Sequence, residues 1–206
     1  CKGAGIAVGA HPGYPDLMGF GRRALSVTPA EMKSYIMYQV GALQTFLRAD
    51  GMTLQHVKPH GAMYNAAAKD IKLSRAICEA IAECAPGAIL LCLSGSEMCR
   101  AAEECGILYA SEVFADRAYE DDGSLVARSK PGAVITDENE AIARVVRMVR
   151  ESKVTSVNGK DISIKADSIC VHGDNAHALE FVTRIRAALK AENISTAPLG
   201  DVISAR

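Results

Sequence analysis

The sequence lacks a large net charge of either sign and lacks any long hydrophobic run. Its 206 residues include 23 lysines and arginines against 24 aspartates and glutamates, a formal net charge of −1. So small an imbalance provides no general attraction for nucleic acid or for an anionic membrane, and we expect neither as a partner. The longest apolar run, 88–93, has the length of a strand and is too short to cross a bilayer. The sequence shows no signal peptide, so we expect a cytoplasmic location.

Cysteines at zinc-ribbon or redox spacing are also absent. The seven cysteines are odd in number and form no CxxC motif, which argues against a tidy set of disulfides. We expect reduced thiols, with Cys92 and Cys170 acting as small hydrophobic side chains inside strands. A phosphate loop of the form GxxxxGK[ST] and an HExxH pair are missing too. A metal site would therefore draw its ligands from separate strands.

Short apolar runs alternate along the chain with helical patterns. The runs are continuous, as in parallel strands covered on both faces, and predict strands at 5–9, 54–57, 88–93, 107–113 and 168–171. Capping residues predict helix starts at Thr28, Ser94, Asp70, Thr136 and Asp174. Two of these starts, at Thr28 and at Ser94, are predicted capping boxes, completed by Glu31 and Glu97.

This alternation predicts an α/β fold built from βα units on a parallel sheet. One segment, 154–164, instead predicts a β-hairpin that turns at Asn158 and Gly159. We find no internal repeat or linker, so we expect a single domain over 1–206. Five strands are too few for a closed βα barrel, and the start of the sequence has the pattern of a helix end running into a strand. We therefore expect a barrel that lacks its first βα units; an open sheet is the alternative.

Ionisable side chains follow nearly every predicted strand. Active sites of βα folds form where the strands end at their carboxyl termini, so we expect these side chains to share a site. The candidates in chain order are His11, Asp16, His56, Lys58, His60, Glu112, Asp116, Arg117, His172 and Asp174.

The candidates near the first two strands also have structural interpretations. His11 could stabilise the turn at 12–15, and His56 could be a core histidine with satisfied hydrogen bonds. Lys58 and His60 share a predicted inward face with His56. A lysine on such a face needs a charged partner or a substrate, which favours function for Lys58 and His60.

The later candidates carry similar alternatives. Asp116 and Arg117 could form an ion pair with each other. Asp174 could cap a helix, and His177 could lie on the surface of that helix. Arg22 follows a glycine-rich loop, where it could bind a carboxylate or phosphate or simply face solvent.

Several long motifs resemble the LamB/YcsF family, the A subunits of 5-oxoprolinase. They are GAHPGYPD at 9–16, GFGRR at 19–23, QHVKPHGAMYN at 55–65, EVFADRAY at 112–119, SKPGA at 129–133 and VHGD at 171–174. The resemblance reaches about Glu192 and implies an irregular (β/α) barrel of the glycoside hydrolase/deacetylase type. The family's opening motifs, an Asp-Leu-Asn-Cys-Asp-like strand and a Gly-Phe-His-Ala-Gly-Asp-like loop, are absent from this sequence. We therefore expect an N-terminally incomplete barrel and an incomplete site.

The resemblance also implies an activity, the ATP-coupled hydrolysis of pyroglutamate to glutamate with partner subunits B and C. Our hypothesis assigns proton transfer to His60 or His11 and the binding of anionic groups to Lys58 and Arg117. Orientation of these bases is assigned to Asp16, Glu112 and Asp174. Further substrate-binding candidates are Asp116, Tyr64, His172 and Arg22.

Two other functions stay open. One is a metal-dependent hydrolase of an N-acyl or carbohydrate substrate, with His11, His60 and His172 as candidate ligands of Zn²⁺ or Mn²⁺. The other is a non-catalytic subunit that binds a small carboxylate without turning it over.

Overall fold

The computed structural model describes residues 1–173 and 178–205 and divides into two compact units. Unit 1 is Cys1–Ala110 and unit 2 is Ser111–Arg206. The single domain expected from the sequence stays a prediction. No helix in the described part of the chain is long and apolar enough to cross a membrane.

Unit 1 contains parallel strands. They are β1 (Val8–Ala10), β2 (Leu54–Val57) and β3 (Ile89–Leu93), with β2 paired to both of the others. The predicted strands at 54–57 and 88–93 are therefore confirmed. The first prediction, 5–9, began too early, because Lys2–Ala4 form the short 3-10 helix η1, which ends at Gly5 with φ of 63°.

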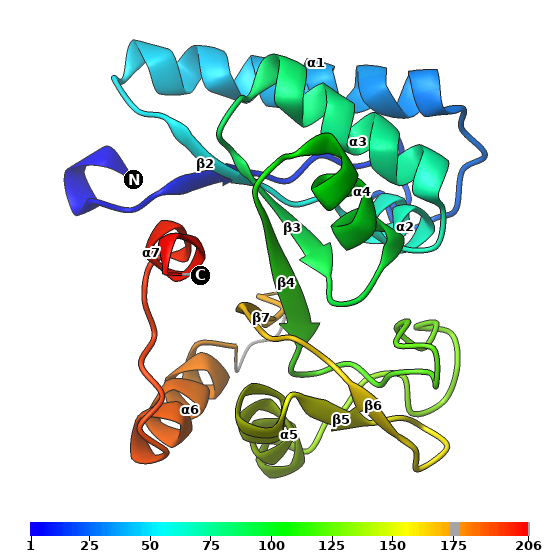
Figure 1. Ribbon diagram of the computed structural model, residues 1–206, viewed down its shortest axis with the longest axis vertical. Helices are drawn as coiled ribbons and strands as arrows, with labels where there is room; N and C mark the ends of the chain where they lie inside the picture. Colours follow the sequence, from blue (N-terminus) through cyan, green and yellow to red (C-terminus); the bar gives the residue numbers. More distant parts are fainter. Residues whose placement is uncertain (174–177, 206) are drawn as a thin grey trace. The chain divides into compact units, whose positions relative to one another are not determined.

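Four α-helices accompany these strands in the described part of unit 1. They are α1 (Pro29–Ala49), α2 (Gly61–Ala67), α3 (Ile71–Cys84) and α4 (Glu97–Cys105). Helix α1 packs beside α3, and α3 beside α4 (Figure 1). The predicted capping box at the start of α1 is confirmed: the Glu31 amide donates to the Thr28 hydroxyl at 3.2 Å, and the Glu31 carboxylate accepts from the Thr28 amide at 2.7 Å. Asp70 caps α3 by accepting from the amides of Lys72 and Leu73.

The second predicted capping box is wrong. Ser94 does not cap α4; the N-cap is Ser96, whose side chain makes no capping hydrogen bond. The reason is a turn after β3, in which the Ser96 amide donates to the Leu93 carbonyl at 3.1 Å. Ser94 lies within this turn, before the helix begins. Helix α4 ends at Gly106, whose φ of 66° lies in the left-handed region that favours glycine.

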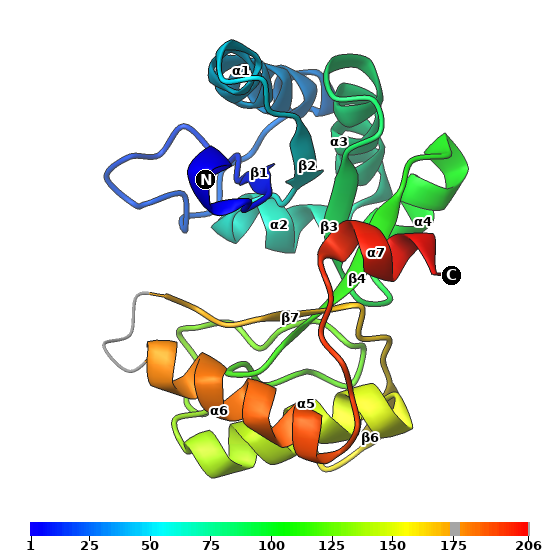
Figure 2. The same cartoon turned by 90° about the vertical axis from the view of Figure 1, so that its left-hand side faces the viewer.

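Unit 2 contains a parallel strand pair, a hairpin and three helices in its described part. These elements are β4 (Tyr109–Phe114, which begins in the last residues of unit 1), α5 (Glu138–Glu151), β5 (Lys153–Thr155), β6 (Asp161–Ser163), β7 (Ser168–Cys170), α6 (Ala178–Ala191) and α7 (Leu199–Ser204). Strand β4 pairs parallel with β7, so that Glu112 faces Ser168 and Phe114 faces Cys170. Helices α5 and α6 lie side by side over a shared apolar core (Figure 2). The predicted α/β fold with parallel strands is confirmed.

The hairpin lies where the sequence placed it. Strands β5 and β6 pair antiparallel, and the Gly159 amide closes the turn on the Ser156 carbonyl at 3.0 Å. Gly159 has φ of 79°, which explains the glycine at this place in the turn. Helix α5 starts at a different cap from the predicted Thr136: the side chain of Asp137 accepts from the amides of Asn139 and Glu140. The start predicted at Asp174 lies outside the described residues.

The N-caps of α3 and α4, Asp70 and Ser96, give a stability test. Removing the Asp70 side chain should lower the free energy of unfolding by about 1 kcal/mol, because two backbone amides of α3 lose their acceptor. The Ser96→Ala variant is the matched control and should change it by less than about 0.5 kcal/mol, since Ser96 makes no capping bond. Urea unfolding of Asp70→Ala and Ser96→Ala measures both. Equal losses in the two variants would contradict the cap assignment.

Candidate functional site

The exits of β1 and β2 are held together by hydrogen bonds that continue beyond the strands. The Lys58 amide donates to the Ala10 carbonyl at 2.9 Å, and the His60 amide donates to the Pro12 carbonyl at 2.8 Å. These bonds bring the rings of His11 and His60 together, with centroids 4.8 Å apart and planes at 76°. Two residues that are 49 positions apart in the sequence thus form one histidine pair.

The hydrogen bonds of this pair require one extra proton. His11 Nδ1 lies 2.7 Å from the Lys58 carbonyl oxygen, His60 Nδ1 lies 2.9 Å from His11 Nε2, and His60 Nε2 lies 2.7 Å from the Phe20 carbonyl oxygen. A carbonyl oxygen only accepts, so each bond to a carbonyl uses an N–H hydrogen, and the bond between the rings uses a third. Two neutral imidazoles supply only one N–H each. All the bonds form together only when the pair is a monocation.

The environment of His11 indicates which ring is charged. Burial of the imidazole lowers the pKa of His11 to about 4; its hydrogen bond to the Lys58 carbonyl opposes this shift, and the nearby charges of His60, Lys58 and His56 add to it. His11 is therefore neutral near pH 7. Its Nδ1 then carries the hydrogen and its Nε2 accepts, so that when all three bonds form the third hydrogen lies on His60.

The loop that follows β1 closes over His60 and leaves no space for additional side-chain atoms. Gly21 has φ of 64°, and a Cβ there would lie 2.9 Å from His60 Cδ2. Gly61 has φ of 55°, and its Cβ would lie 2.7 Å from the Gly21 carbonyl oxygen. The Phe20 ring meets the His60 ring edge-on at 5.3 Å. The glycines of these motifs are thus explained by close packing around the histidine pair.

Asp16 holds this loop in shape. Its buried carboxylate accepts from the Arg23 guanidinium and, at 3.0 Å, from the Gly19 amide. The Arg23 hydrogen bond is the main reason that the pKa of Asp16 falls to about 2. Arg22 places its guanidinium carbon 5.3 Å from the centre of the Phe20 ring. The structure explains how both side chains order the loop; catalysis by Asp16 and substrate binding by Arg22 stay predictions.

His56, Lys58 and Tyr64 surround the histidine pair in different ways. The His56 ring lies against β1, where a Cβ on Gly9 would come within 2.0 Å of Nε2, and burial lowers the pKa of His56. This packing agrees with the interpretation of His56 as a core histidine. Lys58 is half-buried at the exit of β2, and its charge acts on both His11 and His56. Tyr64 is buried within α2, and its amide donates to the His60 carbonyl at 3.4 Å.

Unit 2 forms a second polar cluster, again through a backbone hydrogen bond that continues past the ends of two paired strands. Beyond the paired strands β4 and β7, the Ala115 amide donates to the Cys170 carbonyl at 3.2 Å. This register brings His172 Nδ1 to 2.8 Å from Asp116 Oδ2. Arg128 Nη2 lies 2.8 Å from His172 Nε2. The structure thus joins two predicted residues, Asp116 and His172, to an arginine that the sequence analysis missed.

Arg117 and Glu112 lie deeper in unit 2. Arg117 is 4% exposed and donates to the backbone carbonyls of Ala133 and Val126, so it anchors the loop between them. Burial lowers the pKa of Arg117. In the described part of the chain Asp116 bonds to His172, and no ion pair joins it to Arg117. Glu112 is buried in β4, where its charge adds to the burial that raises the pKa of Tyr119.

Predictions remain for Asp174, for His177 and for a metal site. Asp174 and His177 fall outside the described residues. Among the residues that are described, no group of three or more histidine, cysteine, aspartate or glutamate side chains is placed to hold a metal ion. The assignment of His11, His60 and His172 as metal ligands stays untested.

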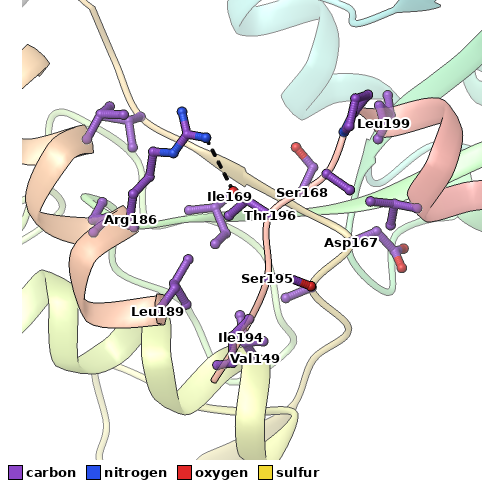
Figure 3. A pocket seen from close by; sticks show the side chains of 17 residues that line it. Val149, Asp167, Ser168, Ile169, Arg186, Leu189, Ile194, Ser195, Thr196 and Leu199 are labelled. Atoms are coloured by element: carbon purple, nitrogen blue, oxygen red, sulfur yellow. Dashed lines mark hydrogen bonds between the residues drawn. The ribbon is translucent and has the colours of Figure 1, made fainter. Parts of the chain in front are cut away.

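Unit 2 contains a cavity of about 720 Å³ (Figure 3). It is bordered by β7, by α6 and by the segment 194–199, and its walls are mainly aliphatic. Its polar contacts include a 3.4 Å hydrogen bond from Arg186 to the Thr196 hydroxyl. No predicted site residue lines it, so we assign the candidate site to the strand exits, where the polar groups lie.

Together the fold and the strand exits define an α/β protein with histidine clusters suited to acid–base chemistry. The sequence profile of the LamB/YcsF family matches residues 1–204, and the chain belongs to this family. A protein of Clostridium beijerinckii, named as the A subunit of 5-oxoprolinase, is 63% identical over 198 residues, which cover 96% of this chain and 78% of that protein. One of the same name from Thermococcus onnurineus is 54% identical over 98% of this chain and 79% of its own length.

A solved structure gives the same result for the fold. The crystal structure of the lactam utilization protein from Thermus thermophilus matches with a TM-score of 0.85 and 42% identity. The match covers 95% of this chain and 78% of the other. The family and the fold implied by the sequence motifs are confirmed.

The low pKa of His11 predicts a pH dependence of stability. Because the pKa falls from 6.5 to about 4 on folding, the folded state binds fewer protons than the unfolded state between these values. The contribution of His11 is thus fully present above pH 6.5 and is lost as the pH falls through about 4. His11→Asn should flatten the dependence of the unfolding free energy on pH in this window, measured by urea unfolding from about pH 4 to about pH 7.5. An unchanged slope would contradict a neutral, desolvated His11.

Proposed function

We propose that this chain is the A subunit of an ATP-coupled 5-oxoprolinase, which hydrolyses the lactam of 5-oxo-L-proline to L-glutamate together with partner subunits B and C. The observation that carries the proposal is the histidine pair, which combines a proton donor and a proton acceptor at the strand exits. The names of the similar proteins support the substrate. Each of those names also describes one component of a larger enzyme, which supports partner subunits. A cytoplasmic location is part of this proposal.

The chemistry explains why ATP is needed. A lactam is stabilised by resonance between its nitrogen and its carbonyl group, and opening the five-membered ring is energetically uphill. Transfer of a phosphoryl group from ATP to the lactam oxygen makes the carbon electrophilic. An acid–base site can then deliver water to this carbon and protonate the ring nitrogen as the C–N bond breaks, which leaves γ-glutamyl phosphate. Hydrolysis of this acyl phosphate by a second water releases L-glutamate and inorganic phosphate. We assign at least part of the ATP handling to the partner subunits.

The residues of unit 1 divide these tasks. We assign His11 the removal of a proton from water by its Nε2, a step that requires the hydrogen bond from His60 to this nitrogen to open when substrate binds. We assign His60 the donation of a proton to the leaving nitrogen, a step that requires one of its N–H groups to leave its acceptor, His11 Nε2 or the Phe20 carbonyl. Lys58 adds a half-buried positive charge beside the pair, suited to the negative charge that develops on oxygen. The proposal leaves the loop residues Asp16 and Arg23 to shape the site.

The decisive test is the release of glutamate from 5-oxo-L-proline by the complex of this protein with subunits B and C, with and without ATP. Glutamate that requires both ATP and this protein is the expected result. An assembled complex that consumes ATP but releases no glutamate would refute the proposal. Metal analysis of the same preparation would then test the metal-dependent alternative.

Loss of the His60 imidazole should remove most of the activity. We expect His60→Gln to lower kcat by about 100-fold or more, the usual effect of losing a general acid, while the complex still assembles. Lys72→Gln is a matched control, because it changes an exposed side chain on α3 and should leave kcat within about twofold. Steady-state kinetics and gel filtration of each complex measure turnover and assembly. Near-native turnover by His60→Gln would remove His60 from the mechanism.

A further inference from the structure

Arg128 in unit 2 is an exposed guanidinium that makes no ion pair within the described part of the chain. Its Nη2 donates to His172 Nε2 at 2.8 Å. The nearby Lys130 behaves differently, because its ammonium group pairs with the Glu120 carboxylate at 2.8 Å. Arg128 thus donates to an imidazole nitrogen and not to a carboxylate, although guanidinium groups pair most strongly with carboxylates.

The hydrogen bonds around His172 determine the roles of its two ring nitrogens. A guanidinium group has only donors, so Nε2 of His172 must present its lone pair to Arg128. The hydrogen of the neutral ring is then on Nδ1, which donates to Asp116 Oδ2 at 2.8 Å. The ring of Phe114 stacks against the imidazole, with centroids 6.0 Å apart and planes at 30°. Asp116 and Phe114 therefore fix the orientation of the imidazole and the direction of the lone pair on Nε2.

The charges around this cluster favour an anion. Asp116 is a single carboxylate that acts between two guanidinium groups, those of Arg117 and Arg128. After burial, which is the largest cause, the charge of Arg128 lowers the pKa of Arg117, and the charge of Asp116 raises it. The two guanidinium groups and the one carboxylate together carry one surplus positive charge. Arg117 is buried and bound to backbone carbonyls, whereas Arg128 is exposed, so Arg128 is the group that can reach a ligand.

We propose that Arg128 is a carboxylate-binding residue, positioned by the Asp116–His172 pair, that accepts a monoanionic carboxylate in place of its hydrogen bond to His172. A guanidinium group binds a carboxylate through two parallel hydrogen bonds, which are stronger than one bond to a neutral imidazole. Binding releases His172 Nε2 as a hydrogen-bond acceptor beside the ligand. Resting on the proposed function, the ligand class is the small carboxylates to which 5-oxo-L-proline and L-glutamate belong, and 5-oxo-L-proline is the probe.

Paired ligands test this inference. 2-Pyrrolidinone is the same lactam ring without the carboxylate, so the contribution of the carboxylate is the ratio of the two dissociation constants. By calorimetry on the complex with B and C, we expect Arg128→Gln to weaken 5-oxo-L-proline binding at least about tenfold and to leave 2-pyrrolidinone binding unchanged. Arg128→Lys should recover part of the loss. Lys130→Gln, the control for charge on the same loop, should leave both affinities unchanged.

A second readout follows His172 directly. In ¹⁵N-resolved spectra of the histidine rings, adding 5-oxo-L-proline should shift the Nε2 signal of His172 in the wild type and leave it in place in Arg128→Gln. An unchanged affinity ratio in Arg128→Gln, or wild-type binding that does not distinguish the two ligands, would overturn the inference.

The inference and the proposed function fail separately. Normal ATP-dependent glutamate release by Arg128→Gln with an unchanged KM would overturn the carboxylate site and leave the function standing. Selective, Arg128-dependent binding of 5-oxo-L-proline by a complex that never releases glutamate would overturn the function and support the site.

Discussion

The parallel ladder between neighbouring strands is the constraint on which both clusters depend. In unit 1 it continues past the ends of β1 and β2 through the amides of Lys58 and His60, which fixes the histidine pair to backbone atoms. In unit 2 the bond from the Ala115 amide to the Cys170 carbonyl extends the pairing of β4 with β7 and brings Asp116 to His172. A shift of either register would separate side chains that lie far apart in the sequence.

Both clusters also use one electrostatic arrangement, a neutral imidazole that accepts a hydrogen bond from a cation. The carbonyl of Lys58 fixes the hydrogen of His11 on Nδ1, and Asp116 fixes that of His172 in the same way. In each case Nε2 is left to accept, from the cationic His60 in one unit and from Arg128 in the other. A backbone carbonyl in unit 1 and a carboxylate in unit 2 thus determine the tautomer, and the tautomer determines which nitrogen accepts from the cation.

Much of this arrangement can be predicted from the sequence, and the parts that cannot be predicted have physical reasons. Continuous apolar runs and caps such as Thr28 predict the strands and most helices, because burial and capping are local properties. Strand exits predict that His11 and His60 meet. The sequence does not predict Arg128, because it lies in an irregular loop without hydrophobic periodicity. Nor does it predict the extra proton, which depends on distances to carbonyl oxygens that only the folded backbone provides.

The placement of the two cations explains why both clusters suit anionic ligands. A hydrogen bond between a cation and a neutral imidazole is weaker than one between that cation and a carboxylate or phosphate, so an arriving anion can displace the imidazole. Arg23, by contrast, is already paired with the carboxylate of Asp16, so its guanidinium group stays bound within its loop. Cations held on neutral acceptors are therefore preorganised yet replaceable.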